Sequence, residues 1–187
     1  MKTPINGLVL VGGQSVRMGT DKSLLEYHGL PQRNFLYQLL GQYCNEVFFA
    51  CRANQIQELA DFQTIVDFQP SVGPITALLS AFAHNAQKTW LIVACDMPFV
   101  GADTIEFLLN HRDATAIATA FLNPETQFPE PLLTIWEPRS APILRVAFER
   151  QERSPLRILQ QNQPKLLIPP VANWLLNVNT LEEYQRL

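Results

Sequence analysis

The sequence predicts an α/β fold: a doubly wound, mostly parallel β-sheet covered by helices on both faces. Short apolar runs alternate along the chain with segments of helical periodicity, which indicates successive βαβ units. The apolar runs are hydrophobic throughout, as expected for strands that are buried on both faces of a sheet. The chain has 187 residues, of which 47% are hydrophobic, and this is enough for one sizeable core. We therefore expect residues 1–187 to form a single domain.

The first half of the chain alternates regularly between the two kinds of element. Strands are expected at Gly7–Val11, Glu46–Cys51, Thr64–Val66 and Trp90–Ala94. Helical segments are expected between them, at Arg33–Tyr43, Ile56–Ala60 and Pro74–Asn85. A proline suits the first position of a helix, because the N–H group that it lacks would have no partner there. Pro74 therefore marks the start of the third helical segment.

The second half is less regular. A β-prone run covers Ala114–Ala120, and the stretch "PEPLLTIW" (Pro129–Trp136) is expected to pair with a neighbouring strand. Helices are expected at Ala141–Arg150 and Pro155–Gln160, before the apolar segment "KLLIP". Thr180 is expected to cap a final helix, because Glu183 stands three residues later in the capping-box position.

Composition narrows the classes of function. The net charge of -3 lacks the basic excess of a nucleic-acid-binding surface, so no nucleic-acid partner is expected. The three cysteines, Cys44, Cys51 and Cys95, are an odd number without a C-x-x-C pair, which suits thiols in a reducing cytoplasm. The apolar run in "MKTPINGLVLVGG" is too short for a signal peptide, and no run of about 18 apolar residues follows. We therefore expect a cytoplasmic protein without a membrane partner.

The stretch "LVLVGGQSVRMGTDKSLL", which starts at Leu8, looks like a phosphate-binding loop of neither common kind. Gly12 and Gly13 are adjacent, unlike the spaced glycines of a dinucleotide fingerprint, and Lys22 does not directly follow a glycine as in a P-loop. Adjacent glycines let backbone amides approach phosphate oxygens. Arg17 offers a forked set of donors, and Lys22 offers a mobile positive charge. A tight turn with two surface cations is the alternative.

Two aspartates follow predicted strands: Asp67 after the third strand and Asp96, in "ACDMPF", after the fourth. Ligands of doubly wound sheets bind at the carboxyl ends of the strands, where both side chains would lie. A carboxylate there can hold Mg²⁺, which takes one or two carboxylates together with phosphate oxygens and water. A turn or helix-capping role is the alternative for Asp96. After Asp67, Gly73 begins a helix whose free N–H groups could meet an anion or a base edge.

Near the C-terminus, the stretch "NVNT" places Asn177 and Asn179 on either side of a valine. Alternate side chains of an extended segment point the same way, so both amides are expected on one side. Such amides can read the edge of a nucleotide or a pterin. A capped turn before the final helix is the alternative, and it explains Thr180 completely and Asn179 in part.

The chain resembles the molybdenum cofactor guanylyltransferase family in five stretches. They occur in this order: "LVLVGGQSVRMGTDKSLL", "GPITALLSAF", "CDMPFV", "EPLLTIW" and "NVNTLEE". The opening motif of that family is L-A-G-G-x-S-x-R-M-G-x-D-K, and Val11 is the one departure from it. The resemblance extends from Leu8 to the final helix. It implies a nucleotide-binding α/β sandwich of the Rossmann-like, nucleotide-diphospho-sugar-transferase type.

The resemblance also implies a reaction, the Mg²⁺-dependent transfer of GMP from GTP to the terminal phosphate of molybdenum-bound molybdopterin with release of pyrophosphate. Its partners would be GTP, the molybdenum-bound pterin and, transiently, proteins that deliver the cofactor or mature molybdoenzymes. Catalytic roles are implied for Arg17, Lys22 and Asp96. The resemblance implies contacts with the nucleotide for Leu10, Val11, Gly12, Gly13 and Asp67. It implies contacts with the GTP phosphates for Lys22 and Arg17, and a role as Mg²⁺ ligand for Asp96, which would also contact GTP. Asn177 and Asn179 would lie on the pterin side.

One position departs from the family pattern. Some members carry an asparagine after the second strand that contacts the guanine nucleotide, and Ala50 stands there. Cys51, Arg52, Asn54 or a backbone group would have to replace that contact. A related nucleotidyltransferase that uses CTP, on the same pterin or on a sugar phosphate, is therefore one alternative. A non-catalytic carrier of the molybdenum cofactor is another, although a carrier needs no metal-binding carboxylate.

Overall fold

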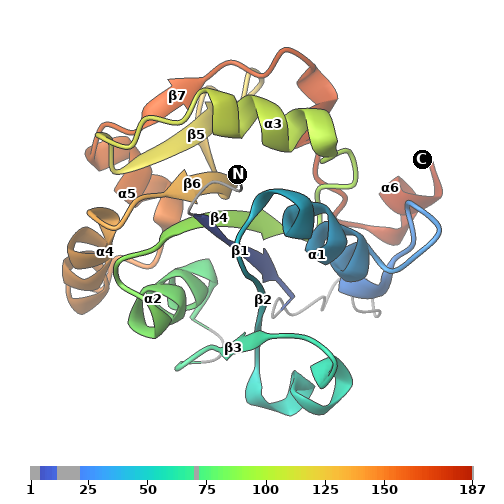
Figure 1. Ribbon diagram of the computed structural model, residues 1–187. Coiled ribbons are helices and arrows are strands. Elements are labelled where there is room, and N and C mark those ends of the chain that lie inside the picture. The colour runs from blue at the N-terminus through green and yellow to red at the C-terminus, as the bar shows by residue number, and fades with distance from the viewer. Residues whose placement is uncertain (1–4, 12–21, 70–71, 187) are drawn as a thin grey trace.

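The computed structural model describes residues 5–11, 22–69 and 72–186 (Figure 1). Gly12, Gly13 and Arg17 of the glycine loop lie outside the described residues. Within them, seven strands form one sheet in the order β3-β2-β1-β4-β6-β5-β7. The strands are β1 (Ile5–Leu10), β2 (Val47–Cys51), β3 (Thr64–Val66), β4 (Thr89–Ala94), β5 (Ala118–Leu122), β6 (Pro129–Trp136) and β7 (Lys165–Leu167).

Every described strand except β6 runs in the same direction. β1 pairs in parallel with β2 and β4, and the outer strands β3 and β7 pair in parallel with β2 and β5. β6 runs antiparallel to both of its neighbours, β4 and β5. The expected mostly parallel sheet is thus confirmed, and so is the pairing of the "PEPLLTIW" strand with its neighbours. The reversed direction of β6 brings its first residues to the edge where the parallel strands end.

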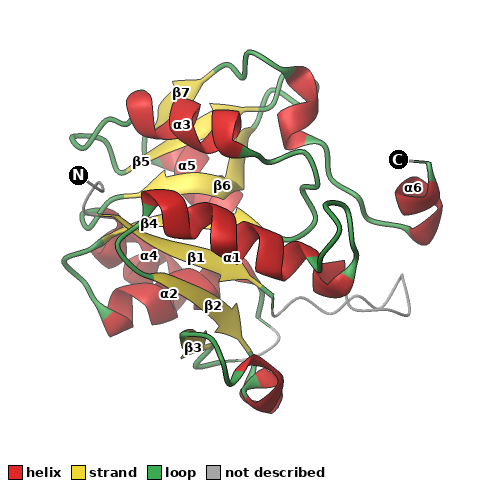
Figure 2. Cartoon of the chain, turned by 45° about the vertical axis from the view of Figure 1, so that its right-hand side comes forward, coloured by secondary structure: helices red, strands yellow, loops and turns green. Residues whose placement is uncertain are grey.

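Helices cover both faces of this sheet (Figure 2). α1 (Gln32–Tyr43) and α3 (Ala102–Asn110) lie on one face. α2 (Pro74–His84), α4 (Ser140–Glu149) and α5 (Pro155–Gln161) lie on the other. The central strand β4 serves both cores, because Leu91 and Val93 pack under α1 and α3 whereas Trp90 and Ile92 pack under the opposite helices. An apolar strand that is covered on both sides produces this doubly wound arrangement, as predicted.

Most expected elements lie within two residues of their observed bounds, and β3 and β6 coincide with them. The predicted capping box is also confirmed. The Thr180 hydroxyl accepts the N–H of Glu183, and the Glu183 carboxylate accepts the N–H of Thr180, at the start of α6 (Leu181–Gln185). Among the described residues, no helix combines the length and the apolar character that a membrane-spanning segment requires.

α3 and the segment Ile56–Ala60 differ from the expected elements. α3 was not predicted, although Ile105, Leu108 and Leu109 stand at the i, i+3, i+4 spacing of an amphipathic helix. The predicted helical piece Ile56–Ala60 instead forms two 3₁₀ turns, η2 (Ala53–Gln55) and η3 (Gln57–Leu59). η2 buries none of its residues and η3 buries Leu59, so little packing would support a longer helix there.

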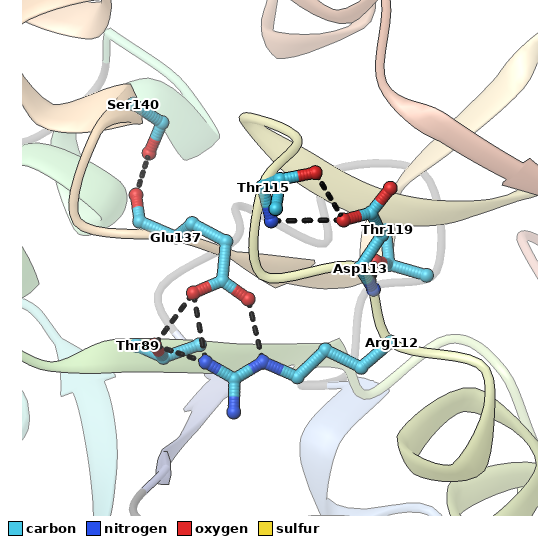
Figure 3. Close-up of polar contacts among 7 residues, drawn as sticks. All are labelled: Thr89, Arg112, Asp113, Thr115, Thr119, Glu137 and Ser140. Carbon is cyan, nitrogen blue, oxygen red and sulfur yellow. Dashed lines mark hydrogen bonds and ion pairs between the residues drawn. The ribbon is translucent and has the colours of Figure 1, made fainter.

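β5 begins four residues later than the predicted run Ala114–Ala120. The Asp113 carboxylate accepts hydrogen bonds from the N–H of Thr115 at 2.8 Å and from its hydroxyl at 2.6 Å, which closes a turn (Figure 3). The N–H of Asp113 donates to the Thr119 hydroxyl at 2.9 Å. Asp and Thr side chains compete with strand hydrogen bonds in this way, so the first residues of the β-prone run form a turn.

A buried ion pair connects the elements that meet at the amino end of β4. Nε and Nη2 of Arg112 contact the two carboxylate oxygens of Glu137 at 2.6 and 2.8 Å, and the Glu137 side chain is 3% exposed. The Thr89 hydroxyl donates to the same carboxylate at 2.8 Å and accepts from Arg112 at 2.9 Å (Figure 3). The Ser140 hydroxyl donates to the Glu137 carbonyl at 2.7 Å. One glutamate therefore joins the ends of α3, β4, β6 and α4.

Replacing Arg112 with alanine is expected to destabilise the fold by about 3–5 kcal/mol, because it leaves the Glu137 charge buried without its partner. Urea unfolding at pH 7 measures this loss. The matched control is Arg157→Ala, which breaks an ion pair with Glu152 in which the arginine side chain is 70% exposed. The control should cost about 0–1 kcal/mol. Equal losses in the two variants would contradict the assigned role of Arg112.

Candidate functional site

The aspartates that the sequence singles out come to one edge of the sheet, where the parallel strands end. Asp96 follows β4 after one intervening residue, and Asp67 directly follows β3. Because β6 is antiparallel to β4, its second residue, Glu130, lies at the same edge. The C-terminal segment before α6 also returns here, since the N–H of Val178 donates to the Asp96 carbonyl at 2.8 Å.

The loop that carries Asp96 is held from three directions. Its three successive carbonyl groups each accept a hydrogen bond from a different part of the chain. The pairs are Val178 N–H to the Asp96 carbonyl at 2.8 Å, the Gln32 side-chain amide to the Met97 carbonyl at 3.2 Å, and His28 Nε2 to the Pro98 carbonyl at 2.9 Å. Gln32 is fully buried at the start of α1. A backbone that is fixed at three points in a row gives the Asp96 side chain a defined position.

The Asp96 carboxylate is largely buried, and among the described residues its Oδ1 atom has no hydrogen-bond partner. Burial raises the pKa of this carboxyl group, while the positive charge of Lys22 and a hydrogen bond from its own N–H oppose the rise. A buried oxygen without a partner is costly, and a divalent cation would satisfy it. The described residues hold no group of three or more His, Cys, Asp or Glu side chains suited to a metal.

Glu130 is a site carboxylate that the sequence analysis missed. β4 and β6 pair with Val93 opposite Leu133, so that Glu130, near the start of β6, comes to the edge where the turn after β4 carries Asp96. The pKa of Glu130 is raised to about 7, chiefly by burial; the hydrogen bond from the Leu132 N–H opposes the rise and the charge of Asp96 adds to it. The motif "PEP" does contain this carboxylate. Only the direction of β6, however, reveals that it faces Asp96.

Lys22 lies close to Asp96 and to the C-terminal segment. Its charge opposes the rise in the pKa of Asp96, and its Nζ atom donates to Oδ1 of Asn179 at 2.8 Å. Val178 is 1% exposed, whereas Asn177 and Asn179 on either side of it are exposed. This alternation agrees with the extended segment expected from the sequence. Lysine, aspartate and asparagine thus meet at one place, although they come from three distant parts of the chain.

Leu10, the last residue of β1, and Val11, which follows it, lie at the same edge of the sheet. Leu10 is partly exposed, and the side chain of Val11 is buried. The N–H of Val11 donates to the Ala50 carbonyl at 3.1 Å, and its carbonyl accepts the Gln55 side-chain amide at 3.2 Å. Ala50 itself is 1% exposed and packs in the core on the α2 side of the sheet. Its side chain therefore cannot contact a ligand in the way that an asparagine at this position would.

Asp67 forms a second, separate part of the edge. Its N–H donates to the Cys51 carbonyl at 2.9 Å, and its Oδ1 atom is buried without a hydrogen-bond partner among the described residues. Burial raises the pKa of Asp67 to about 6, against the opposing charge of Arg52. Burial and the charge of Asp67 together raise the pKa of the Cys51 thiol to about 11. The side chain of Cys51, the last residue of β2, is buried, whereas Arg52 is partly exposed and Asn54 is exposed.

The strand order fixes how far apart the two parts lie. Asp96 follows β4 and Asp67 follows β3, with β1 and β2 between them. Three strand spacings of about 4.8 Å separate them by roughly 14 Å along the edge. The structure therefore brings together Asp96, Lys22 and Asn179, with Glu130 added, and places Asp67 apart.

Residues 7–166 of the chain match the family model described as the MobA-like NTP transferase domain. The chain belongs to this family. It is 35% identical to the molybdenum cofactor biosynthesis bifunctional protein of Synechocystis sp. over 100% of the chain, which spans 54% of that relative. It is also 30% identical to the molybdenum cofactor guanylyltransferase of Xanthomonas euvesicatoria, over 100% of the chain and 96% of the relative. The chain thus spans about half of the first relative and nearly all of the second.

A solved structure supports the fold of this family member. The molybdopterin-guanine dinucleotide biosynthesis protein A of Archaeoglobus fulgidus superposes with a TM-score of 0.81 over 97% of this chain and 96% of that protein, at 24% identity. The predicted fold class is therefore confirmed. Membership of the family makes the chain a nucleotidyltransferase, as the order of its motifs predicted.

The raised pKa of Asp67 predicts a pH-dependent stability. The folded protein keeps the proton of Asp67 up to about pH 6, whereas the unfolded chain loses it near pH 4. The folded state therefore binds more protons in this window, and stability falls as the pH rises through it. After a discount for solvent screening, we expect Asp67→Asn to remove about 1–2 kcal/mol of this fall.

Urea unfolding of the wild type and the variant at pH 4.5 and pH 7 gives the difference in free energy directly. Asp61→Asn is the matched control, because Asp61 is an exposed aspartate near the same strand. It should retain the wild-type fall. If the Asp67→Asn curve ran parallel to that of the wild type, Asp67 would not be the buried carboxyl group described above.

Proposed function

We propose that this chain transfers GMP from GTP to the terminal phosphate of molybdenum-bound molybdopterin, in an Mg²⁺-dependent reaction that forms molybdopterin guanine dinucleotide and pyrophosphate. The observation that carries the proposal is the meeting of Lys22 with Asp96 at the carboxyl edge of the sheet. A cation for phosphate and a buried carboxylate with an unpartnered oxygen are the two groups that metal-dependent phosphate chemistry requires. Relatives named molybdenum cofactor guanylyltransferase support the choice of substrates.

The reaction requires no general base in this proposal. The acceptor is a phosphate that is ionised at neutral pH, and one of its oxygens forms a bond to the α-phosphorus of GTP. The bond between that phosphorus and the bridging oxygen breaks, and pyrophosphate leaves with the electron pair. The difficulty is to bring two anions together, so the chain must neutralise charge and align the reactants. Lys22, Arg17 and the amides of Gly12 and Gly13 are proposed to do this.

Asp96 is proposed to hold the Mg²⁺ ion. Its Oδ1 atom, which has no partner among the described residues, fits such a role, and Glu130 supplies a second carboxylate nearby at the start of β6. The ion would contribute positive charge beside the GTP phosphates. The three hydrogen bonds to the carbonyls of residues 96–98 keep the Asp96 ligand in place while the substrates exchange.

The nucleotide is proposed to lie across β1, with its phosphates at Lys22 and its base toward β2 and β3. Leu10 and Val11 then border it together with Gly12 and Gly13 of the loop, and Asp67 contacts its far end. Ala50 affects which base is expected, because its buried side chain cannot supply the contact that some relatives make with asparagine. CTP is therefore the competing substrate to be tested. Asn177 and Asn179 are proposed to face the pterin-bearing substrate.

Pyrophosphate release from a mixture of GTP, Mg²⁺ and molybdenum-bound molybdopterin tests this function. Release with GTP and none with CTP is the expected outcome. Release with CTP in its place would retain nucleotidyl transfer but overturn the assignment of the base. Binding of the pterin without any release of pyrophosphate from either nucleotide would identify a carrier and contradict the proposal.

Asp96→Asn is expected to abolish the transfer while leaving the fold intact, because a neutral amide is a weak ligand for Mg²⁺ and the buried charge is also removed. Calorimetric titration with GTP, with Mg²⁺ and then with a chelator, provides a readout that does not depend on turnover. The Mg²⁺-dependent part of the affinity should fall by at least about tenfold, the loss that even outer-shell changes produce at metal sites. Asp103→Asn, an exposed aspartate of α3, is the matched control. Full activity in Asp96→Asn would rule out Asp96 as the metal ligand.

A further inference from the structure

We propose that Asn179 is a positioning residue for Lys22, so that the C-terminal segment Asn177–Tyr184 belongs to the nucleotide half of the site as well as to the acceptor half. The inference rests on the proposed function, because it assumes that Lys22 meets the phosphates of GTP. It assigns Asn179 a task that can be measured before any acceptor is added. The contact that motivates it is the 2.8 Å hydrogen bond from Lys22 Nζ to Asn179 Oδ1.

The backbone of Asn179 is held firmly enough to orient its side chain. Its N–H donates to the Glu183 carboxylate at 2.6 Å, and the next N–H, that of Thr180, donates to the same oxygen at 3.2 Å. The N–H of Glu183 donates in return to the Thr180 hydroxyl at 3.2 Å. The capping box of α6 therefore does more than begin a short helix. It also fixes the peptide that carries the Asn179 amide.

A second anchor ties this segment to the proposed metal ligand. Val178, the residue before Asn179, is buried, and its N–H donates to the Asp96 carbonyl at 2.8 Å. Adjacent residues of the C-terminal segment thus contact Asp96 and Lys22. Two neighbouring residues therefore connect the backbone of Asp96 and the ammonium group of Lys22 to the same segment, and a shift of the segment would move both contacts together.

A third anchor holds α6 against the chain that follows Lys22. The Tyr184 hydroxyl donates to the Glu26 carbonyl at 3.1 Å, and the Tyr184 and Tyr27 rings meet edge to face with centroids 5.2 Å apart. Figure 1 shows α6 beside this part of the chain, away from the main body of the sheet. The segment that follows Lys22 and the segment that follows Asn179 are therefore also in contact with each other, through Tyr184.

The chemistry of the pair explains why an amide suits this position. A lysine side chain is long and flexible, and it binds phosphate only when its ammonium group is held near the right place. An amide oxygen accepts one of the three N–H donors and leaves the charge of the ammonium group intact. A carboxylate would hold the lysine more tightly but would neutralise the charge that attracts phosphate. Asn179 therefore orients Lys22 without competing with an anionic ligand.

GTP titration in the absence of acceptor tests this role. Asn179→Ala should raise the Kd of GTP by about threefold to tenfold, the effect of losing one net hydrogen bond. Asn179→Asp should raise it at least as much, because the new carboxylate pairs with Lys22. The matched control Asn173→Ala replaces an exposed asparagine just upstream and should bind GTP as the wild type does.

A double-mutant cycle separates positioning from a general structural effect. If Asn179 acts through Lys22, Asn179→Ala should have no further effect on GTP affinity in a Lys22→Ala background. An equal loss in both backgrounds would show that Asn179 acts by another route and would overturn the inference. Wild-type affinity in Asn179→Ala would overturn it as well. Failure of the wild type to bind GTP at all would instead contradict the proposed function.

Discussion

The structure depends most on how the turn after β4 is held. The carbonyls of Asp96, Met97 and Pro98 follow the central strand of the sheet, and each accepts a hydrogen bond from a different segment. One donor precedes α1, one lies at its start, and one belongs to the C-terminal segment. Because buried backbone groups need partners, this turn draws together parts of the chain that share no strand pairing. The site is assembled around the position that these bonds define.

The two ends of the β4–β6 pair show opposite uses of buried charge. At one end Thr89 stands opposite Glu137 in the register, and Arg112 completes a fully bonded network. At the other end Asp96 lies near Glu130, and both carboxylates have raised pKa values. A satisfied network fixes the geometry of the strands at one end, whereas Oδ1 of Asp96 at the other end has no hydrogen-bond partner among the described residues. The end with the satisfied network thus supports the end at which we propose that a cation binds.

The sequence predicted the parallel strands and the residues that directly follow them, because both depend on local patterns. Apolar runs located β3 and β6 to the residue, and the position after a strand identified Asp67 and Asp96. Glu130 and the contact between Lys22 and Asn179 depend instead on the direction of β6 and on the return of the C-terminus, neither of which a local pattern encodes. α3 was also missed, although Ile105, Leu108 and Leu109 stand at helical spacing, so that a local pattern was sufficient to predict it.

In the proposed binding mode, the strand order makes base recognition separable from phosphate chemistry. Asp96 and Lys22 lie at the end of β4, whereas Asp67 lies three strands away at the end of β3. Ala50 stands between these points with its side chain in the core, so in this binding mode the base contact would come from a backbone group or from Arg52 and Asn54, which reach the surface. Arg52 precedes η2, Asn54 lies within it, and neither belongs to the apolar core. A change of base preference therefore requires no change in the groups that surround the phosphates.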